Sequence, residues 1–205
     1  MHNYVNKIII VFAHPRFEKS KTNRALVEGV LDLPGVILND LYEQYPDFNI
    51  DVRREQELLS GHSIIIWHHP FYMYGAPSLL KQWIDLVLEH GWAHGRDGEF
   101  LKGKVVFNTI TAGGTRDVYA AGRQNRFTIR ELLAPFEQTA NLCKMIYLPP
   151  FVVHGTYLLS GRQLADTVRL YRRLLEILGA GGWNVDSLKQ FSYLNDWLLQ
   201  QEGNE

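Results

Sequence analysis

The stretch SIIIWHHPFYMYGAPSLLKQWID, residues 63–85, decides the fold of this chain. Its first five residues are an apolar run, which predicts a buried β-strand. Two prolines, a glycine and four consecutive residues from Phe71 to Tyr74, three of them aromatic, then indicate a rigid turn. Leu79, Leu80, Trp83 and Ile84 follow at helical spacing. Strand, turn and helix in this order are typical of a parallel α/β sheet, in which ligands bind at the loops that follow the strands.

The rest of the chain repeats this alternation. Further strands are predicted over residues 7–13, 36–42, 104–111 and 144–148, the last stopped by Pro149 and Pro150. Helices are expected from Ser20 or Thr22, over 51–59, from 79 to about 89, over 126–141 with a break or kink at Pro135, over 160–178 and over 186–200. Five strands alternating with helices predict a flavodoxin-like, doubly wound five-stranded parallel sheet with helices on both faces.

Composition limits the class of protein without naming a partner. With 205 residues, we expect one domain over residues 1–180 and a C-terminal helical extension, 181–205, packed on that domain or on a dimer partner. The charge balance of 21 basic and 22 acidic residues gives no field that would recruit nucleic acid. Without a signal-like start or a long apolar run, the protein is expected to be soluble and cytoplasmic. Cys143 is the only cysteine, which excludes an internal disulfide and a thiol metal cluster.

Three unusual loops should meet at one crevice. In the flavodoxin-like strand order the switch point lies between the first and third strands. The loops over residues 14–23, 70–75 and 111–114 follow the first, third and fourth predicted strands. We therefore expect them to converge at the carboxyl edge of the sheet.

Each loop has an ordinary structural interpretation as well as a functional one. Ser20, Thr22 and Asn23 at a helix start suit a phosphate, although they are also common N-caps. The aromatic residues of the second loop provide ring faces, although isolated aromatics are more often part of a core. Gly113 and Gly114 let a backbone with free N–H groups approach a ligand, although alone they form only a turn. Together the loops match the phosphate, ring face and polar edge of flavin mononucleotide, FMN.

Other chemistries lack their sequence patterns. The dinucleotide pattern GxGxxG, the phosphate-binding GxxxxGK[ST], the zinc pattern HExxH and the nucleophile pattern GxSxG are all absent. His68 and His69 are successive at a strand end and should point to opposite faces of the sheet. His90 and His94 flank a glycine in a segment unsuited to a stable helix. No metal site is predicted.

Ordered motifs across the chain resemble a known family. They are AHP at 13–15, SxTN at 20–23, HPxxxYxxPxxLKxWxD at 69–85, HGWAHG at 90–95, TAGG at 111–114 and LPPFxxHG at 148–155. The chain is similar to the flavodoxin-fold NAD(P)H:quinone oxidoreductases. Within them, YPDFNID at 45–51 resembles the ancillary proteins of bacterial glutathione-regulated potassium-efflux systems. The resemblance covers about residues 7–178.

The resemblance implies a homodimeric flavoprotein that passes two electrons from NADH or NADPH to a quinone. FMN is the expected cofactor, with FAD as an alternative. By position, the phosphate end would be held by His14, Ser20, Lys21, Thr22 and Asn23. The ring would be flanked by Pro70, Phe71, Tyr72, Met73 and Tyr74, and its polar edge would meet Thr111, Ala112, Gly113 and Gly114. The chain departs from the family at Met73, where members usually have Trp.

For catalysis, the predicted proton sources are Tyr74 and His154, the latter because a histidine pKa lies near neutrality. A packed or hydrogen-bonded loop histidine is the alternative for His154. A regulatory subunit of a potassium-efflux membrane protein, held at the inner face of the membrane by that partner, is the alternative function. A one-electron carrier is disfavoured by the balanced charge.

Overall fold

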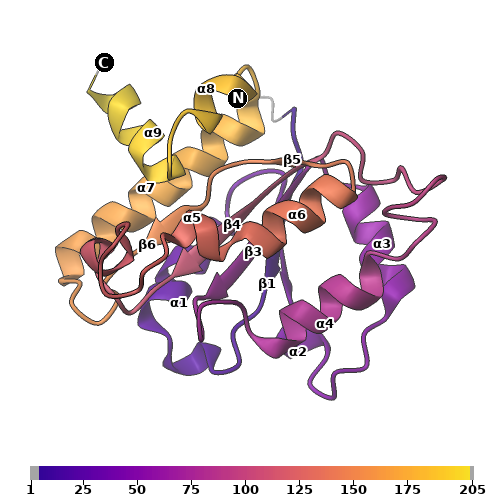
Figure 1. Cartoon of the computed structure of the whole chain (residues 1–205), viewed down its shortest axis with the longest axis horizontal. Helices are drawn as coiled ribbons and strands as arrows, with labels where there is room; N and C mark the ends of the chain where they lie inside the picture. The colour runs from indigo at the N-terminus through magenta and orange to yellow at the C-terminus, as the bar shows by residue number, and fades with distance from the viewer. Residues whose placement is uncertain (1–4, 204–205) are drawn as a thin grey trace.

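The computed structural model, which describes residues 5–203, contains one twisted parallel sheet (Figure 1). Its strands are β1 (Ile8–Phe12), β2 (Val36–Asp40), β3 (Ile64–Pro70), β4 (Val105–Thr111), β5 (Ile146–Tyr147) and β6 (Phe151–Val153). The order is β2-β1-β3-β4-β5, and β6 also pairs with β4. All of these pairings are parallel. The predicted flavodoxin-like fold class is therefore confirmed.

The central strands are apolar because helices cover both of their faces. Every residue of β1, β3 and β4 is buried. Side chains alternate between the faces, so Ile8 and Ile10 belong to one core while Ile9 and Val11 belong to the other. A continuous β-branched run is the pattern of a strand buried on both sides.

The first core lies beneath α1 (Lys21–Glu28), α7 (Gly161–Ala180), α8 (Val185–Lys189) and α9 (Leu194–Glu202). The second lies beneath α2 (Leu41–Gln44), α3 (Val52–Ser60), α4 (Ser78–Val87) and α6 (Ala134–Leu142). Shorter elements are η1 (Phe17–Lys19), η2 (Arg116–Tyr119) and α5 (Ile129–Leu132). A third, smaller apolar cluster lies beside η2 and α5.

Three segments differ from the sequence prediction. The fifth strand position is divided by Pro149 and Pro150 into β5 and β6, both paired with β4. The helix expected over 126–141 is two helices, α5 and α6, and Pro135 lies in the first turn of α6. Proline is tolerated there because N–H groups of a first turn have no partner within the helix. The helix expected over 186–200 is also two helices, α8 and α9.

The C-terminal segment packs on the same chain. Leu188 of α8 and Leu194 and Leu198 of α9 are almost fully buried in the core that α7 and β1 share. The division of the chain at residue 180 stays a prediction. Within residues 5–203, no helix has both the length and the apolar character needed to cross a membrane.

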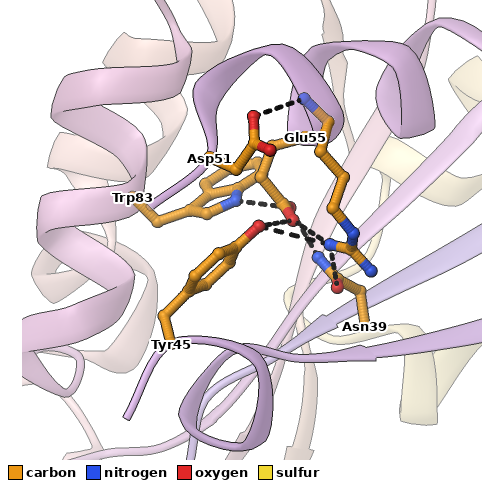
Figure 2. A network of polar contacts seen from close by, with 6 residues as sticks. Asn39, Tyr45, Asp51, Glu55 and Trp83 are labelled. Atoms are coloured by element: carbon orange, nitrogen blue, oxygen red, sulfur yellow. Dashed lines mark hydrogen bonds and ion pairs between the residues drawn. The ribbon is translucent and has the colours of Figure 1, made fainter. Parts of the chain in front are cut away.

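Glu55 is a fully buried carboxylate that joins four elements of the second face (Figure 2). It accepts hydrogen bonds from Tyr45 Oη at 2.7 Å, Trp83 Nε1 at 2.8 Å and Asn39 Nδ2 at 2.5 Å. The Arg54 guanidinium pairs with the same carboxylate at 2.5 Å. Because β2, α3, α4 and the residue after α2 all contribute, this network fixes the helices behind the sheet relative to one another.

Candidate functional site

A crevice of about 440 Å³ lies at the carboxyl ends of β1, β3 and β4. This is the size range of small-molecule sites. It is lined by His14, Arg16, Lys19, Ser20, Lys21, Thr22, Asn23, Pro70, Phe71, Tyr72, Thr111, Gly113, Thr156 and Tyr157. The three loops expected to converge do so, at the switch point between β1 and β3.

The first loop is held by a buried amide. Asn23 Nδ2 donates to Ser20 Oγ at 2.8 Å and to Thr111 Oγ1 at 2.9 Å, which ties the start of α1 to the end of β4. Ser20 is the N-cap of α1, and its hydroxyl also accepts the backbone N–H of Asn23 at 3.4 Å. The positive end of the α1 dipole therefore faces the crevice.

His68 supports this amide from beneath. Its Nε2 lies 3.1 Å from Asn23 Oδ1, and because a carbonyl oxygen only accepts, the imidazole is the donor. Burial lowers the pKa of His68 to about 3, with smaller contributions from His69 and His14. The imidazole is therefore neutral at pH 7. Sequence reasoning did not assign His68 a role in this loop.

Positive charge lines the same end of the crevice. Arg16, Lys19 and Lys21 all contribute to its wall. His14 is neutral at pH 7, because burial lowers its pKa against an opposing effect of Glu18. Its Nδ1 accepts the backbone N–H of Arg16 at 3.0 Å. Cations beside a helix start are a donor set for a phosphate dianion.

The aromatic loop is a tight turn with unusual backbone angles. Tyr72 and Gly75 form an antiparallel bridge, and the Gly75 N–H donates to Tyr72 O at 2.9 Å. Between them Met73 and Tyr74 have φ of 47° and 65°. Two successive positive φ values define a type I′ turn, which Asn and Gly favour. Strained residues that are not glycine cluster at ligand sites.

This turn exposes its side chains. Met73 is 91% exposed and Tyr74 is 51% exposed, while Phe71 is buried. Tyr74 Oη donates to Asn125 Oδ1 at 3.2 Å. The ring of Tyr72, which lines the crevice, meets the ring of His14 edge to face at 5.9 Å. The turn thus presents aromatic surface at the crevice and beyond its wall.

The glycine turn offers backbone donors. The carbonyls of Ala112 and Gly114 accept from Thr156 and Gly155 at 3.2 Å and 2.9 Å. Across residues 5–203, no hydrogen bond engages the N–H groups of Gly113 or Gly114. A Cβ at Gly113 would lie 2.8 Å from the Tyr157 ring. A side chain at position 113 would therefore require the exposed Tyr157 ring to move.

Ten of the predicted cofactor residues line the crevice together. Those outside its lining are Met73, Ala112 and Gly114, each next to a lining residue along the chain, and Tyr74, which is two residues from Tyr72. The sequence reading missed Arg16, Lys19, Thr156 and Tyr157. The two cations could have been found from their place in the polar loop after β1, whereas nothing in the spacing indicates the 156–157 loop.

His154 lies behind the glycine turn. Its ring contacts those of Tyr119 and Tyr193, with centroids 6.0 Å and 5.6 Å away. Burial, followed by the charge of Arg116, lowers its pKa to about 4. The backbone of Gly114 lies close enough to oppose this fall in the pKa, although neither buried ring nitrogen reaches ordinary hydrogen-bond geometry in the described chain. At pH 7 this neutral imidazole is a weak proton source, and it is not part of the crevice lining.

The paired histidines of β3 point to opposite faces. His68 meets Asn23 and Tyr171 on one side, whereas His69 stacks on Phe136 on the other. Asn108 Nδ2 lies 3.0 Å from His69 Nε2. Burial lowers the pKa of His69 to about 4. No cluster of metal-ligating side chains occurs in the part of the chain described, 5–203.

The crevice has the features that a flavin requires. It combines a cationic helix start, aromatic surface and free backbone N–H groups, in that order across the ends of β1, β3 and β4. The residues present therefore fit a flavin mononucleotide.

Comparison with known proteins gives the same fold. A family model described as a flavodoxin-like fold matches residues 6–176. The glutathione-regulated potassium-efflux system ancillary protein KefG of Pectobacterium atrosepticum is 42% identical over 165 residues, which are 80% of this chain and 90% of that protein.

Among the similar solved structures, three share more than 30% identity with this chain. General stress protein 14 of Treponema denticola, in complex with FMN, is 34% identical with a TM-score of 0.80, covering 84% of this chain and 99% of that one. An NADPH-quinone reductase from P. pentosaceus is 31% identical with a TM-score of 0.76, covering 87% and 99%. A protein described as a tryptophan halogenase from Streptomycin violaceusniger is 40% identical with a TM-score of 0.78, covering 81% and 96%.

Proposed function

We propose that this chain, which belongs to the family with a flavodoxin-like fold, is a flavin-dependent NAD(P)H:quinone oxidoreductase. The observation that carries the proposal is the convergence of the Ser20, Tyr72 and Gly113 loops on one crevice. The FMN in the 34% identical structure and the quinone reductase named at 31% identity support it. When bound, the flavin would accept a hydride from NADH or NADPH and reduce a quinone by two electrons.

The chain's own residues would bind and orient the cofactor. Ser20, Thr22 and the α1 N-terminus would hold the phosphate, with Lys21 supplying charge. Tyr72 would flank the ring. The N–H groups of Gly113 and Gly114 would donate to its polar edge and stabilise negative charge there.

FMN is our preferred cofactor over FAD. The cationic end of the crevice, where Arg16 and Lys19 join the α1 N-terminus, suits a terminal phosphate.

Tyr74 is the proton source that we retain. It is half-exposed and lies two residues after Tyr72 of the crevice wall, so we place it within reach of a substrate at the ring face. His154 is the weaker of the two predicted sources, since its pKa of about 4 leaves little of the acidic imidazolium form at pH 7. A homodimer, in which residues 91–98 and the exposed aromatic turn contact the partner, completes the proposal.

Cofactor analysis tests the proposal directly. The purified protein should show visible flavin absorbance, and mass analysis of the released cofactor should give FMN. NAD(P)H oxidation should then depend on an added quinone. Absence of flavin absorbance even after reconstitution with FMN or FAD would contradict the proposal.

A second function is favoured by the sequence of the relatives. The 42% identical protein is named as an ancillary protein of a potassium-efflux system. We therefore propose, as an alternative compatible with the first, that this chain binds and regulates such a membrane protein at the inner face of the membrane. Potassium loss under electrophile stress, in cells with and without the chain, tests it. Unchanged efflux after deletion would contradict it.

A further inference from the structure

Tyr193, the residue before the C-terminal helix α9, packs in the same apolar cluster as Ala112 of the glycine turn. The family match ends at residue 176, so α8 and α9 lie outside it. Yet α9 packs against β6 and α7 near the glycine turn at 111–114. Figure 1 shows α9 and β6 on the same side of the molecule as α7. We infer that Tyr193, Asn195 and Asp196 of this segment are positioning residues that clamp the glycine turn.

The first contact of the clamp is with β6. The Asn195 side chain accepts the backbone N–H of Val152 at 2.8 Å and donates to its carbonyl at 3.1 Å. It thereby completes both hydrogen bonds of one residue in a strand, as a neighbouring strand would. The N–H of Leu194 also donates to Pro150 O at 3.0 Å. The segment after the two prolines is thus fixed in the sheet by α9.

β6 and the residues that follow it are hydrogen-bonded directly to the glycine turn. The Ala112 N–H donates to Val153 O at 2.8 Å, and the Gly155 N–H donates to Gly114 O at 2.9 Å. Thr156, which follows, donates to Ala112 O at 3.2 Å. The glycine turn is therefore hydrogen-bonded to the same segment, β6 and the residues that follow it, to which Asn195 is bonded.

The second contact is with η2, directly after the turn. Arg116 donates to both carboxylate oxygens of Asp196, at 2.8 Å and 2.7 Å. Its guanidinium also lies 4.9 Å from the centre of the Tyr193 ring. A bidentate pair fixes orientation as well as position. The Arg116 and Asp196 side chains are 57% and 26% exposed, so we expect a moderate coupling.

η2 closes around the other side of the turn. A Cβ at Gly114 would lie 2.7 Å from Val118 and 2.9 Å from the Tyr119 ring, so these side chains lie against the glycine. Tyr193 belongs to the same apolar cluster as Tyr119, Ala112 and Phe71. Both flanks of the turn, β6 and η2, are therefore held by α9.

The inference rests on the proposed flavin site, because the consequence of the clamp is the placement of the Gly113 and Gly114 N–H groups. Asp196→Ala and Asn195→Ala test its two contacts separately. The matched control is Asp32→Ala. Asp32 receives the same bidentate fork from Arg172, at 2.5 Å and 3.0 Å, but lies beyond the far end of α1 from Ser20.

Two measurements are made on each full-length variant. Titration of apo-protein with FMN should give a dissociation constant about threefold higher for Asp196→Ala and unchanged for Asp32→Ala. Amide hydrogen exchange of the peptide covering 111–118 should be about threefold faster in Asp196→Ala and Asn195→Ala only. The double variant Arg116→Ala/Asp196→Ala should have the same FMN dissociation constant and amide exchange rate as either single variant, because all three lack the same ion pair.

The two proposals fail in different ways. Wild-type protein that binds neither FMN nor FAD would contradict the proposed function, while amide exchange of residues 111–118 would still decide the clamp. Normal FMN affinity and normal 111–118 exchange in Asp196→Ala and Asn195→Ala would overturn the clamp. If Asn195→Ala fails to fold, Asp196→Ala, which changes a partly exposed side chain, still allows both the FMN titration and the amide exchange measurement.

Discussion

Asn23 donates its side-chain amide to Thr111 Oγ1 at 2.9 Å, which joins the two ends of the crevice through one buried residue. Asn23→Leu keeps the size of the side chain and removes this bond, the bond to Ser20 and the acceptor of His68. We expect the FMN dissociation constant to rise about tenfold, or roughly 1.4 kcal/mol. Fluorescence titration measures it. Asn141→Leu, on the exposed side of α6, is the control and should bind FMN normally.

The buried histidines should make the protein sensitive to acid. The pKa of His68 falls to about 3 in the folded state, against about 6.5 unfolded, so between these values only the unfolded chain takes up its proton. Stability from this group is complete above pH 6.5 and is lost as the pH falls below it, at about 1.4 kcal/mol per pH unit. In urea unfolding, the free energy of unfolding of His68→Gln should fall less than that of the wild-type protein between pH 6 and pH 5. Parallel curves for the two proteins would contradict the assignment.

The strained turn at Met73 should lower the stability of the folded protein. Met73→Gly relieves a positive φ of 47°, so we expect the free energy of unfolding to rise by about 1 kcal/mol. Met73→Ala is the matched control, since it removes the same side chain but keeps a Cβ at that φ. Denaturant unfolding should separate the two variants. Equal stability of Met73→Gly and Met73→Ala would show that the turn is unstrained.

Tyr74 should contribute to FMN affinity through its ring more than through its hydroxyl. Its Oη bond to Asn125 is long, 3.2 Å, and exposed. We therefore expect Tyr74→Phe to leave FMN affinity within about twofold, whereas Tyr74→Ala should weaken it about tenfold through lost aromatic surface. Titration of both variants with FMN measures this. An unchanged constant in Tyr74→Ala would remove this residue from the site.

Much of the fold follows from local sequence pattern. The β-branched run at Ile8–Phe12 predicts a strand buried on both faces, and this is what β1 is. Ser20, Asp51 and Ser160 are N-cap residue types, and each side chain does cap its helix. These features depend on residues three or four apart, so a single sequence carries them.

The features that the sequence does not predict depend on distant contacts or on local strain. Arg116 and Asp196 lie 80 residues apart, and neither spacing nor composition connects them. Met73 and Tyr74 adopt a turn that local preference assigns to Asn and Gly, so tertiary structure overrides propensity there. Pro149 and Pro150 indicate a strand end, but pairing with β4 resumes at β6, where Asn195 and the Leu194 N–H provide further partners.

Glu55 gives the sharpest test of the region behind the crevice. Its carboxylate, fully buried, accepts from Tyr45, Asn39 and Trp83 and pairs with Arg54 (Figure 2). Glu55→Ala leaves these donors without their acceptor in an apolar layer, so we expect a loss of roughly 3 kcal/mol in unfolding free energy.

Glu57→Ala, two residues along α3 and exposed, serves as the control for Glu55→Ala and should change stability by less than about 0.5 kcal/mol. The Tyr45 phenol reports on the network independently. Burial and the Glu55 carboxylate raise its pKa to about 12 in the folded protein. In Glu55→Ala the ultraviolet titration of that phenol should move toward lower pH, because the neighbouring negative charge is gone. A variant that keeps wild-type stability and an unmoved tyrosine titration would show that the network does not hold α3 and α4 together.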